Sequence, residues 1–383
     1  MSPRVLHVSQ PGDGGVAAVV AQLARDQVER GLEVLVAGPS KAALRPAVHA
    51  AGARFTAWDA KRSPGPGTLR EARSLARVIA AEDPDLVHLH SSKAGLAGRL
   101  ALRGRRPTLF QPHSWSFEAL RGPLRGAAAV WERRAAAWTD AIVCVSETER
   151  LHGRAAGIDG RYVVVPNGVD LGAFARAGAE ERAVARSRLE LADGPLAVCV
   201  GRLCRQKGQD VLLEAWPAVR DRMPDARLVL VGDGPTELEL RAAAGEGVDL
   251  VGTRDDIPDW LAAADVVVAP SRWEGMSLTL LEAMATARSV VATDVAGARE
   301  ALGDEAGAVV PVESVTELVD AVVERLRNPV LAADEGRAGR RRAEQFHDMR
   351  TANDHIVALY GEILGGAPGR AASAETAAFH PTP

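Results

Sequence analysis

The 383-residue sequence has only three cysteines, Cys144, Cys199 and Cys204, too few and too irregularly spaced for a disulfide framework or a zinc knuckle. We expect reduced core thiols, as in a cytosolic protein. Aromatic residues make up only 4% of the chain, so Ala, Val and Leu must build the core. No apolar run approaches the roughly 18 residues of a membrane-spanning helix. The first run is also too short for a secretion signal, so the sequence predicts a cytoplasmic protein.

The remaining composition is that of a globular protein, with 47% hydrophobic and 25% charged residues, 37 Gly and 22 Pro. The length favours two or three domains. Short β-branched runs alternate with longer segments of helical period, which predicts parallel sheets with crossover helices. Two series of six strands are expected, at 5–8, 34–37, 86–89, 108–111, 141–145 and 162–165, then at 196–200, 228–231, 248–251, 266–269, 290–292 and 309–312. This α/β pattern predicts two Rossmann-like parallel-sheet domains facing across a cleft.

The expected domains are 1–170 and 190–345, with a helix at about 346–364 that joins the first domain and a disordered tail at 366–383. The net charge of −4 conceals an asymmetry, because residues 1–180 carry 24 Lys and Arg against 17 Asp and Glu. Segment 99–134 is rich in arginine: Arg99, Arg103, Arg105, Arg106, Arg121, Arg125, Arg133 and Arg134. It could face an anionic membrane, a phosphorylated acceptor or only water. Nucleic acid is disfavoured, because no basic stretch is interleaved with aromatics.

Loops that follow strands should line the site, because ligands bind at the carboxyl ends of parallel strands. The segment GRLCRQKG places Arg202 and Lys207 on a glycine-bounded turn before a helix, which suits a diphosphate. For one Arg and one Lys taken alone, the alternative of ordinary surface cations at a helix start is favoured. The segment VGDGP, with Gly232 and Gly234, fits a ligand loop or a structural turn.

The segment APSRWEGMSLTLLEAMA adds Glu274 in a loop and Glu282 in the helix after it, with Ser277 as a candidate helix cap. Two carboxylates beside a helix N-terminus can hold a polyhydroxyl ligand, one at the ribose and the other at the sugar. The alternative is a helix-dipole partner at Glu274 and a solvent-facing Glu282.

In the first half, the GDGG turn resembles a phosphate cradle without a Walker lysine. His113 follows a strand, where structural and functional interpretations weigh about equally. His88 and His90 lie on one strand face with Lys93 in the next turn, and no third ligand lies nearby in sequence. A metal site is therefore not expected.

These motifs together resemble retaining glycosyltransferases of family 4. GRLCRQKG, VGDGP, the Glu-x7-Glu element and VVATDVAG follow in family order, as do VHLHSSKAGLAGRLA, VCVSETER and VVVPNGVD before them. The resemblance covers about 1–345 and implies the glycosyltransferase-B fold, with an acceptor domain and a nucleotide-sugar domain. It is closest to transferases of exopolysaccharide and cell-surface glycans.

By this resemblance, Arg202 and Lys207 bind the diphosphate, Glu282 the ribose and Glu274 the sugar, with His113 beside the sugar. The catalytic set is then His113, Arg202, Lys207 and Glu274. The other donor-binding positions are Gly15, Gly275, Met276, Ser277, Leu278 and Glu282. The acceptor-side candidates are Gly14, His90, Lys93 and Trp115. No metal or cofactor is implied beyond the donor.

The expected reaction is sugar transfer with retention from a nucleotide-diphosphate sugar, a UDP-sugar being favoured, to a polyprenyl-linked or cell-surface glycan precursor. The membrane contact would use segment 99–134, so the protein would be cytoplasmic and peripheral to the inner membrane face. Transfer to a small secondary metabolite and an inactive nucleotide-sugar-binding protein stay open. The chain departs from the family at Ala287-Arg288-Ser289, where a Gly-x-Pro turn is usual, and the base-contacting loop 252–256 fits loosely.

Overall fold

The computed structural model describes residues 2–365, so the predicted tail at 366–383 lies outside the described residues. The chain divides into two compact units. The first comprises the chain up to Asn167 together with the segment from Arg350, and the second spans Gly168–Met349. The final helix therefore belongs with the first unit. No helix within 2–365 has both the length and the hydropathy to cross a membrane.

The first unit is built on a seven-stranded parallel sheet in the order β3-β2-β1-β4-β5-β6-β7. The strands are β1 (Arg4–Ser9), β2 (Glu33–Gly38), β3 (Arg54–Ala57), β4 (Leu86–His90), β5 (Thr108–Gln111), β6 (Ala141–Cys144) and β7 (Tyr162–Val164). The helices are α1 (Gly15–Glu29), α2 (Leu44–Ala50), α3 (Thr68–Glu82), α4 (Ser91–Leu102), α5 (Pro123–Ala136), α6 (Glu147–Ala155) and α15 (Met349–Leu364).

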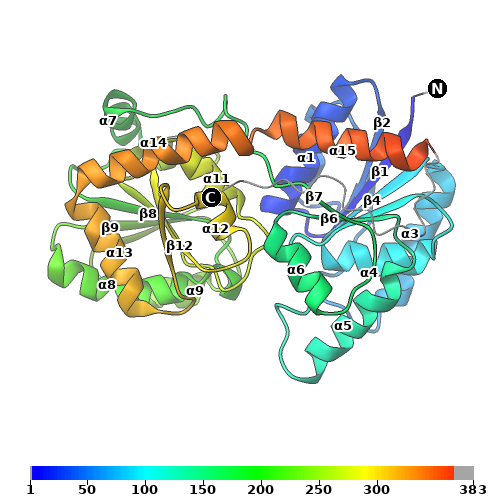
Figure 1. Cartoon of the computed structure of the whole chain (residues 1–383). Helices are drawn as coiled ribbons and strands as arrows, with labels where there is room; N and C mark the ends of the chain where they lie inside the picture. Colours follow the sequence, from blue (N-terminus) through cyan, green and yellow to red (C-terminus); the bar gives the residue numbers. More distant parts are fainter. Residues whose placement is uncertain (1, 366–383) are drawn as a thin grey trace. The chain divides into compact units, whose positions relative to one another are not determined.

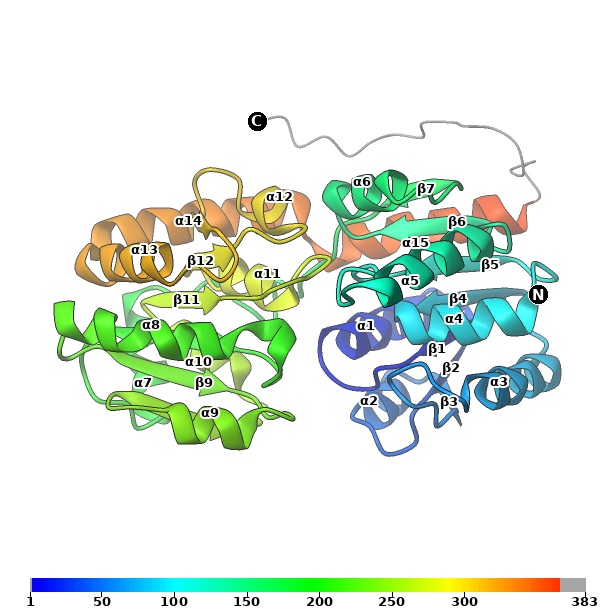
Figure 2. The same cartoon turned by 90° about the horizontal axis from the view of Figure 1, so that it is seen from below.

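Side chains alternate across this sheet and form two cores. On one face, Leu6, Val8 and Leu89 pack against α3, α4 and α5, and Figure 2 shows α4 in front of β4 and β1. On the other face, Val34 and Val36 pack against α1 and α2. Helix α15 reaches this second face through Tyr360.

The second unit contains a six-stranded parallel sheet in the order β10-β9-β8-β11-β12-β13. Its strands are β8 (Leu196–Val200), β9 (Arg227–Val231), β10 (Val248–Gly252), β11 (Val266–Ala269), β12 (Ser289–Thr293) and β13 (Gly307–Val310). Its helices are α7 (Ala179–Arg188), α8 (Gln209–Arg222), α9 (Glu237–Ala243), α10 (Ile257–Ala263), α11 (Leu278–Ala285), α12 (Ala298–Leu302), α13 (Val315–Arg327) and α14 (Pro329–Phe346), with a 3-10 turn at Arg205–Lys207.

Helices α8 and α13 lie side by side on one face of this sheet and bury the aliphatic side chains of β8, β9, β11 and β12 (Figure 1). Helix α11 packs against α14 on the other face. The predicted fold class of two Rossmann-like parallel-sheet domains is confirmed.

The strand prediction was wrong in three details. It missed β3, a four-residue edge strand whose side chains are only partly buried and carry no clear alternation. It placed the last strand at 309–312, whereas β13 begins at Gly307, whose backbone lies against Val290. Pro311 follows β13 and cannot donate a ladder hydrogen bond, so the strand ends before it.

Each sheet has one position where its strand order reverses, between β1 and β4 in the first and between β8 and β11 in the second. Loops after such strands diverge and leave a crevice at the carboxyl edge. The candidate residues can therefore be examined in each unit at this position.

Candidate functional site

The loops at the reversal point of the second sheet carry the predicted donor residues. Arg202 and Lys207 follow β8, and Glu274 follows β11. Glu282 lies in the second turn of α11, which begins directly after the β11 loop. The loop after β8, and the loop after β11 with the helix that follows it, thus bring two cations and two carboxyl groups to one edge of the sheet.

Glycines pack these loops against each other, main chain to main chain. A Cβ at Gly208 would lie 2.0 Å from the carbonyl oxygen of Pro270, and one at Gly297 would lie 2.4 Å from that of Gly275. Gly232 and Gly234 would meet the carbonyl oxygens of Gly201 and Leu203, each at 2.2 Å. All four glycines have positive φ. The VGDGP turn therefore has a structural role in packing onto the Arg202 loop.

Lys207 and Glu274 form an ion pair, with Nζ 2.6 Å from Oε1. The same oxygen accepts a hydrogen bond from the Ser271 hydroxyl at 3.0 Å, and Gln206 donates to the carbonyl oxygen of Trp273 at 3.0 Å. Burial alone would lower the pKa of Lys207, but the Glu274 carboxylate outweighs it and the pKa is raised. Lys207 is therefore a fixed positive charge.

Arg202 is different, because its guanidinium has no ion-pair or hydrogen-bond partner among residues 2–365, although it is only partly exposed. A cation held by its loop and left without an anion is suited to an anionic ligand. In α11, burial raises the pKa of Glu282 to about 7, and the charge of Lys207 limits the rise. The carboxyl group of Glu282 therefore titrates close to neutral pH.

The N-terminus of α11 has the predicted position but not the predicted cap. Ser277 is the N-cap residue, yet its hydroxyl makes no capping hydrogen bond. Met276 and Leu278 beside it are buried, at 5% and 9% exposure. The first amide groups of α11 are thus not capped by that side chain, and an anion at this end is favoured by the helix dipole.

In the first unit, the loop after β1 turns at Gly14, with φ of 76°, and α1 begins at Gly15. A Cβ on Gly14 would meet nothing within 4 Å, so open space adjoins this turn. Gly12 instead packs against the side chain of Ala42. Gly14 and Gly15 are consistent with a helix N-terminus that is accessible to a ligand.

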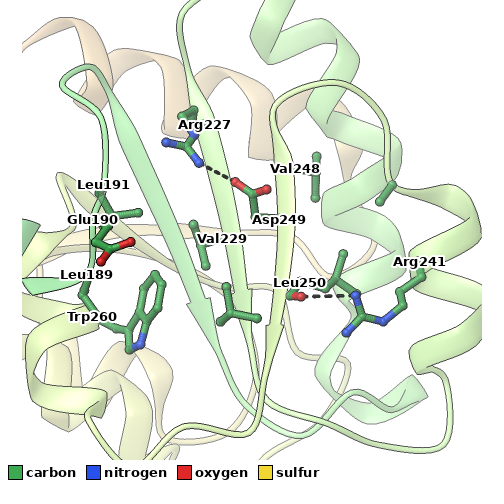
Figure 3. A pocket seen from close by; sticks show the side chains of 12 residues that line it. Leu189, Glu190, Leu191, Arg227, Val229, Arg241, Val248, Asp249, Leu250 and Trp260 are labelled. Atoms are coloured by element: carbon green, nitrogen blue, oxygen red, sulfur yellow. Dashed lines mark hydrogen bonds and ion pairs between the residues drawn. The ribbon is translucent and has the colours of Figure 1, made fainter.

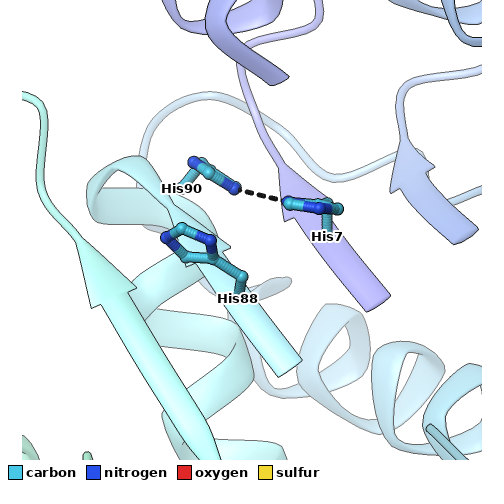
Figure 4. Close-up of side chains that lie close together, drawn as sticks. All are labelled: His7, His88 and His90. Atoms are coloured by element: carbon cyan, nitrogen blue, oxygen red, sulfur yellow. Dashed lines mark hydrogen bonds between the residues drawn. The ribbon is translucent and has the colours of Figure 1, made fainter. Parts of the chain in front are cut away.

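Three buried histidines meet beside this loop. His7 on β1 lies next to His88 on β4 in the sheet register, and His90 lies two residues further on the same face (Figure 4). One ligand nitrogen from each lies within 4.8 Å of the others. The sequence argument against a metal site was that no third ligand was near, and that premise is wrong. The sequence argument could not include His7, because only the pairing of β1 with β4 in the sheet brings His7 beside His88.

His113 follows β5 and is partly exposed. Its φ is 56° and that of Ser114 is 112°, both unfavourable for side-chain-bearing residues. The buried carboxylate of Glu149 accepts from the backbone amides of Ser114, at 2.5 Å, and of Val145, at 2.7 Å, which stabilises this backbone. Sequence analysis missed Glu149. Strained backbone held by a buried acid is typical of functional positions.

Two acceptor-side candidates are used inside the first unit. Lys93 was expected in a turn, but it lies in α4, is 3% exposed and pairs with Glu71 at 2.6 Å. Trp115 is 1% exposed and donates from Nε1 to the Glu149 carbonyl at 2.7 Å. Both side chains therefore pack in the interior rather than facing an acceptor. The third, His90, is fully buried and contacts His113.

The arginine-rich segment is also not one continuous surface. Arg99 is fully buried, pairs with Glu132 at 2.6 Å and stacks on the Phe110 ring. The expectation that it faces a membrane is wrong, because α4 turns it into the core. Exposed arginines remain around α5 at Arg121, Arg125, Arg133 and Arg134.

The second unit also has a pocket of about 580 Å³ beside β9 and β10 (Figure 3). Both arginines that line it are paired, since Arg227 binds Asp249 at 2.6 Å and Arg241 donates to the Leu250 carbonyl. None of the predicted site residues lines it. It is therefore separate from the loops at the reversal point.

Two Rossmann-like parallel-sheet units, each with its loops at the carboxyl ends of the strands, form the glycosyltransferase-B fold. Among solved structures, the complex of Anabaena HepE with UDP and glucose matches 94% of this chain and 99% of that chain, with a TM-score of 0.80 and 22% identity. The family model described as Glycosyltransferase Family 4 matches residues 13–173, and the one described as Glycosyl transferases group 1 matches 194–328.

Curated relatives agree. The GDP-mannose-dependent alpha-(1-6)-phosphatidylinositol monomannoside mannosyltransferase of Mycobacterium tuberculosis is 34% identical over 297 residues, covering 72% of this chain and 75% of the relative. The Escherichia coli UDP-Gal:alpha-D-GlcNAc-diphosphoundecaprenol alpha-1,3-galactosyltransferase is 32% identical over 241 residues, covering 58% and 61%. The GDP-mannose-dependent monoacylated alpha-(1-6)-phosphatidylinositol monomannoside mannosyltransferase of Corynebacterium glutamicum is 34% identical over 219 residues, and there the match spans only 58% of the relative's length. The chain belongs to glycosyltransferase family 4.

Proposed function

We propose that this protein transfers a sugar from a nucleotide-diphosphate sugar to a lipid-linked glycan acceptor, with retention of configuration. The observation that carries the proposal is Arg202, whose guanidinium has no partner among residues 2–365 and which shares a loop with Lys207 of the Lys207–Glu274 ion pair. The named relatives use GDP-mannose or UDP-galactose and act on phosphatidylinositol- or undecaprenol-linked acceptors, which supports a donor and an acceptor of these classes.

In the proposed reaction, the bond between the anomeric carbon and the diphosphate breaks, and its electron pair goes to the departing phosphate oxygen. Arg202 and Lys207 stabilise the growing negative charge, where preorganised cations act most strongly. The acceptor oxygen forms the new bond on the same face, and its proton passes to the leaving phosphate. The two cations supply the positive charge, so no metal or other cofactor is part of the proposal.

The other side chains hold the donor. Glu282, once ionised, accepts from the ribose hydroxyls, and Glu274 accepts from hydroxyls of the sugar. The N-terminus of α11, where the Ser277 side chain makes no capping hydrogen bond, donates amides to the donor's anionic or hydroxyl oxygens. Glu274 is held in place by Lys207 and Ser271, so its carboxylate is oriented before the sugar binds.

The test combines the full chain with UDP- and GDP-sugars and with three acceptors: a polyprenyl-diphosphate-linked sugar, a phosphatidylinositol mannoside and an aminocyclitol. Transfer to either lipid, with an α-linked product by NMR from an α-linked donor, is expected. A β-linked product would contradict retention. Transfer only to the aminocyclitol would contradict the lipid acceptor, and donor binding without any transfer would identify an inactive binding protein.

We also propose that the surface around α5 contacts anionic membranes. Leu124 and Val130 are 65% and 41% exposed on this helix, beside the exposed Arg121, Arg125 and Arg134. Apolar side chains flanked by arginine are typical of helices that lie in a membrane interface. Co-sedimentation with vesicles containing anionic lipid, lost in high salt, is expected because salt screens the arginines. Binding to zwitterionic vesicles of equal strength would contradict it.

A further inference from the structure

Four side chains of the first unit form one hydrogen-bonded chain from the core to the surface. The Oε1 of Gln27 lies 2.9 Å from Nε2 of His7, whose Nδ1 lies 2.9 Å from Nε2 of His90. The Nδ1 of His90 lies 3.2 Å from Nε2 of His113. The chain runs from α1 through β1 and β4 to the loop after β5, and Figure 4 shows its central bond.

The Gln27 amide sets the direction of this chain. Its carbonyl oxygen faces His7 and can only accept, so Nε2 of His7 must carry the proton. Its NH2 group donates to the hydroxyl of Tyr360 at 3.4 Å, and that hydroxyl bonds to Nδ1 of His88 at 2.7 Å. The opposite amide orientation would reverse every proton along the chain.

The histidines hold one proton each. His7, His90 and Gln27 are fully buried, and a buried imidazolium without an anion is costly. Burial lowers the pKa of His7 to about 4 and that of His113 to about 3, and it also lowers the pKa of His90 well below the ordinary value. A neutral imidazole that donates at one nitrogen accepts at the other. Each ring of the chain therefore carries its proton on the same nitrogen, Nε2.

The outer end of the chain is the Nδ1 of His113. This atom has no hydrogen-bond partner among the described residues, yet it is not one of their buried unpaired atoms. It is therefore accessible to solvent. With the proton fixed on Nε2, the accessible atom is a lone pair.

We propose that Gln27, His7 and His90 are positioning residues that fix His113 in the Nε2–H tautomer, so that its Nδ1 accepts a hydrogen bond from a substrate hydroxyl. The proposal deepens the proposed function, on which the identity of the substrate rests. The chain ends on an amide, which takes up no proton near neutral pH, so it orients His113 without drawing a proton inward.

A metal ion held by His7, His88 and His90 is the competing use of these rings. It requires lone pairs that converge on one point. Here His7 and His90 donate and accept between each other, and His88 bonds to Tyr360. Metal content is therefore an outcome of the test.

The experiment is ¹⁵N NMR of the full chain labelled at histidine, without substrate, in the native protein and three variants. Gln27→Met removes the terminal acceptor at similar volume. Gln27→Glu, measured at pH 8, restores a group that only accepts once ionised. Val20→Ala, on the same helix and fully buried, perturbs packing without touching the chain. His113 should show the Nε2–H tautomer in the native protein, Gln27→Glu and Val20→Ala, and a mixture in Gln27→Met.

Kinetics supply the second readout. In Gln27→Met, kcat/KM for transfer should fall about 3- to 10-fold, because only the correctly protonated fraction is competent, while the Kd of UDP or GDP alone stays unchanged. Three results would each overturn the proposal: an Nδ1–H tautomer on native His113, an unaltered tautomer in Gln27→Met, or one bound metal ion per chain. If no acceptor is glycosylated, the proposed function fails while the NMR result still decides the tautomer.

Discussion

The ammonium of Lys207 lies 2.6 Å from the carboxylate of Glu274, joining the loop after β8 to the loop after β11. The pair neutralises itself, whereas Arg202 and the exposed Arg205 of the same loop have no ion-pair partner among residues 2–365. Lys207 therefore orients a carboxylate, whereas the guanidinium of Arg202 is available to bind an anion. The first two predictions follow from this difference.

Replacing Arg202 by Ala should lower kcat by about 100-fold or more, because one preorganised charge donor to the leaving phosphate is lost. Steady-state kinetics with a saturating donor measure the change. Arg205→Ala is the matched control, since Arg205 lies in the same loop and is exposed. A near-native rate in Arg202→Ala would remove its assigned role.

Glu274→Gln should destabilise the protein by about 1–3 kcal/mol, because it leaves the partly buried Lys207 without its anion. The pKa of Lys207 is raised in the folded protein, so the pair's contribution is complete below the unfolded lysine value and is lost as pH rises above it. Urea unfolding at pH 7 and pH 10.5 should show a smaller difference between variant and native protein at the higher pH. An equal difference would contradict the pairing.

Binding of a nucleotide sugar should weaken as pH falls from 8 to 6, because Glu282 must be ionised to accept from two ribose hydroxyls. With a pKa of about 7, roughly nine tenths of this group is ionised at pH 8 and one tenth at pH 6, so Kd should rise about 10-fold. Calorimetry measures this Kd, and the Glu282→Gln variant should bind the nucleotide sugar weakly at both pH values. The contribution of Glu282 to the free energy of unfolding depends on pH in the opposite sense. Because its carboxyl pKa is raised in the folded protein, this contribution becomes less favourable as pH rises from 4.5 to 7.

Ala287 adopts φ of 61°, at the position where the family resemblance implies the glycine of a Gly-x-Pro turn. Ala287→Gly should stabilise the protein by about 1 kcal/mol, because a side chain in the left-handed region is strained. Ala285→Gly, two residues earlier and inside α11, should cost about 1 kcal/mol instead. Thermal unfolding of the two variants measures these effects. Melting temperatures that both rise, or both fall, relative to the native protein would contradict the prediction.

Arg99→Met should lower the free energy of unfolding by about 3–5 kcal/mol, because Glu132 would be left buried without its cation. It should not change vesicle binding. Arg121→Ala with Arg125→Ala should do the reverse, with weaker vesicle binding and native-like stability. Loss of vesicle binding in folded Arg99→Met would contradict the distinction between buried and exposed arginines.

The sequence predicted what local patterns encode. Apolar runs located twelve of the thirteen strands, and motif positions after strands located Arg202, Lys207 and Glu274 at the reversal point. What it missed depends on neighbours across the sheet. His7 lies beside His88 only through strand register. Gln27 and Tyr360, which are 333 residues apart, reach the same face from two different helices. Arg99 was misassigned because its partner Glu132 lies in another helix.

The glycines that pack the loops after β8, β9, β11 and β12 against each other have a consequence for evolution and design. Since Gly208, Gly232, Gly234 and Gly297 allow carbonyl contacts that a Cβ would block, this part of the second unit is assembled before any ligand arrives. Free and liganded crystals of that unit should superpose closely at these loops. Donor preference can then be re-engineered only through side chains that project from a rigid frame, and residues 253–256 are the natural place to begin.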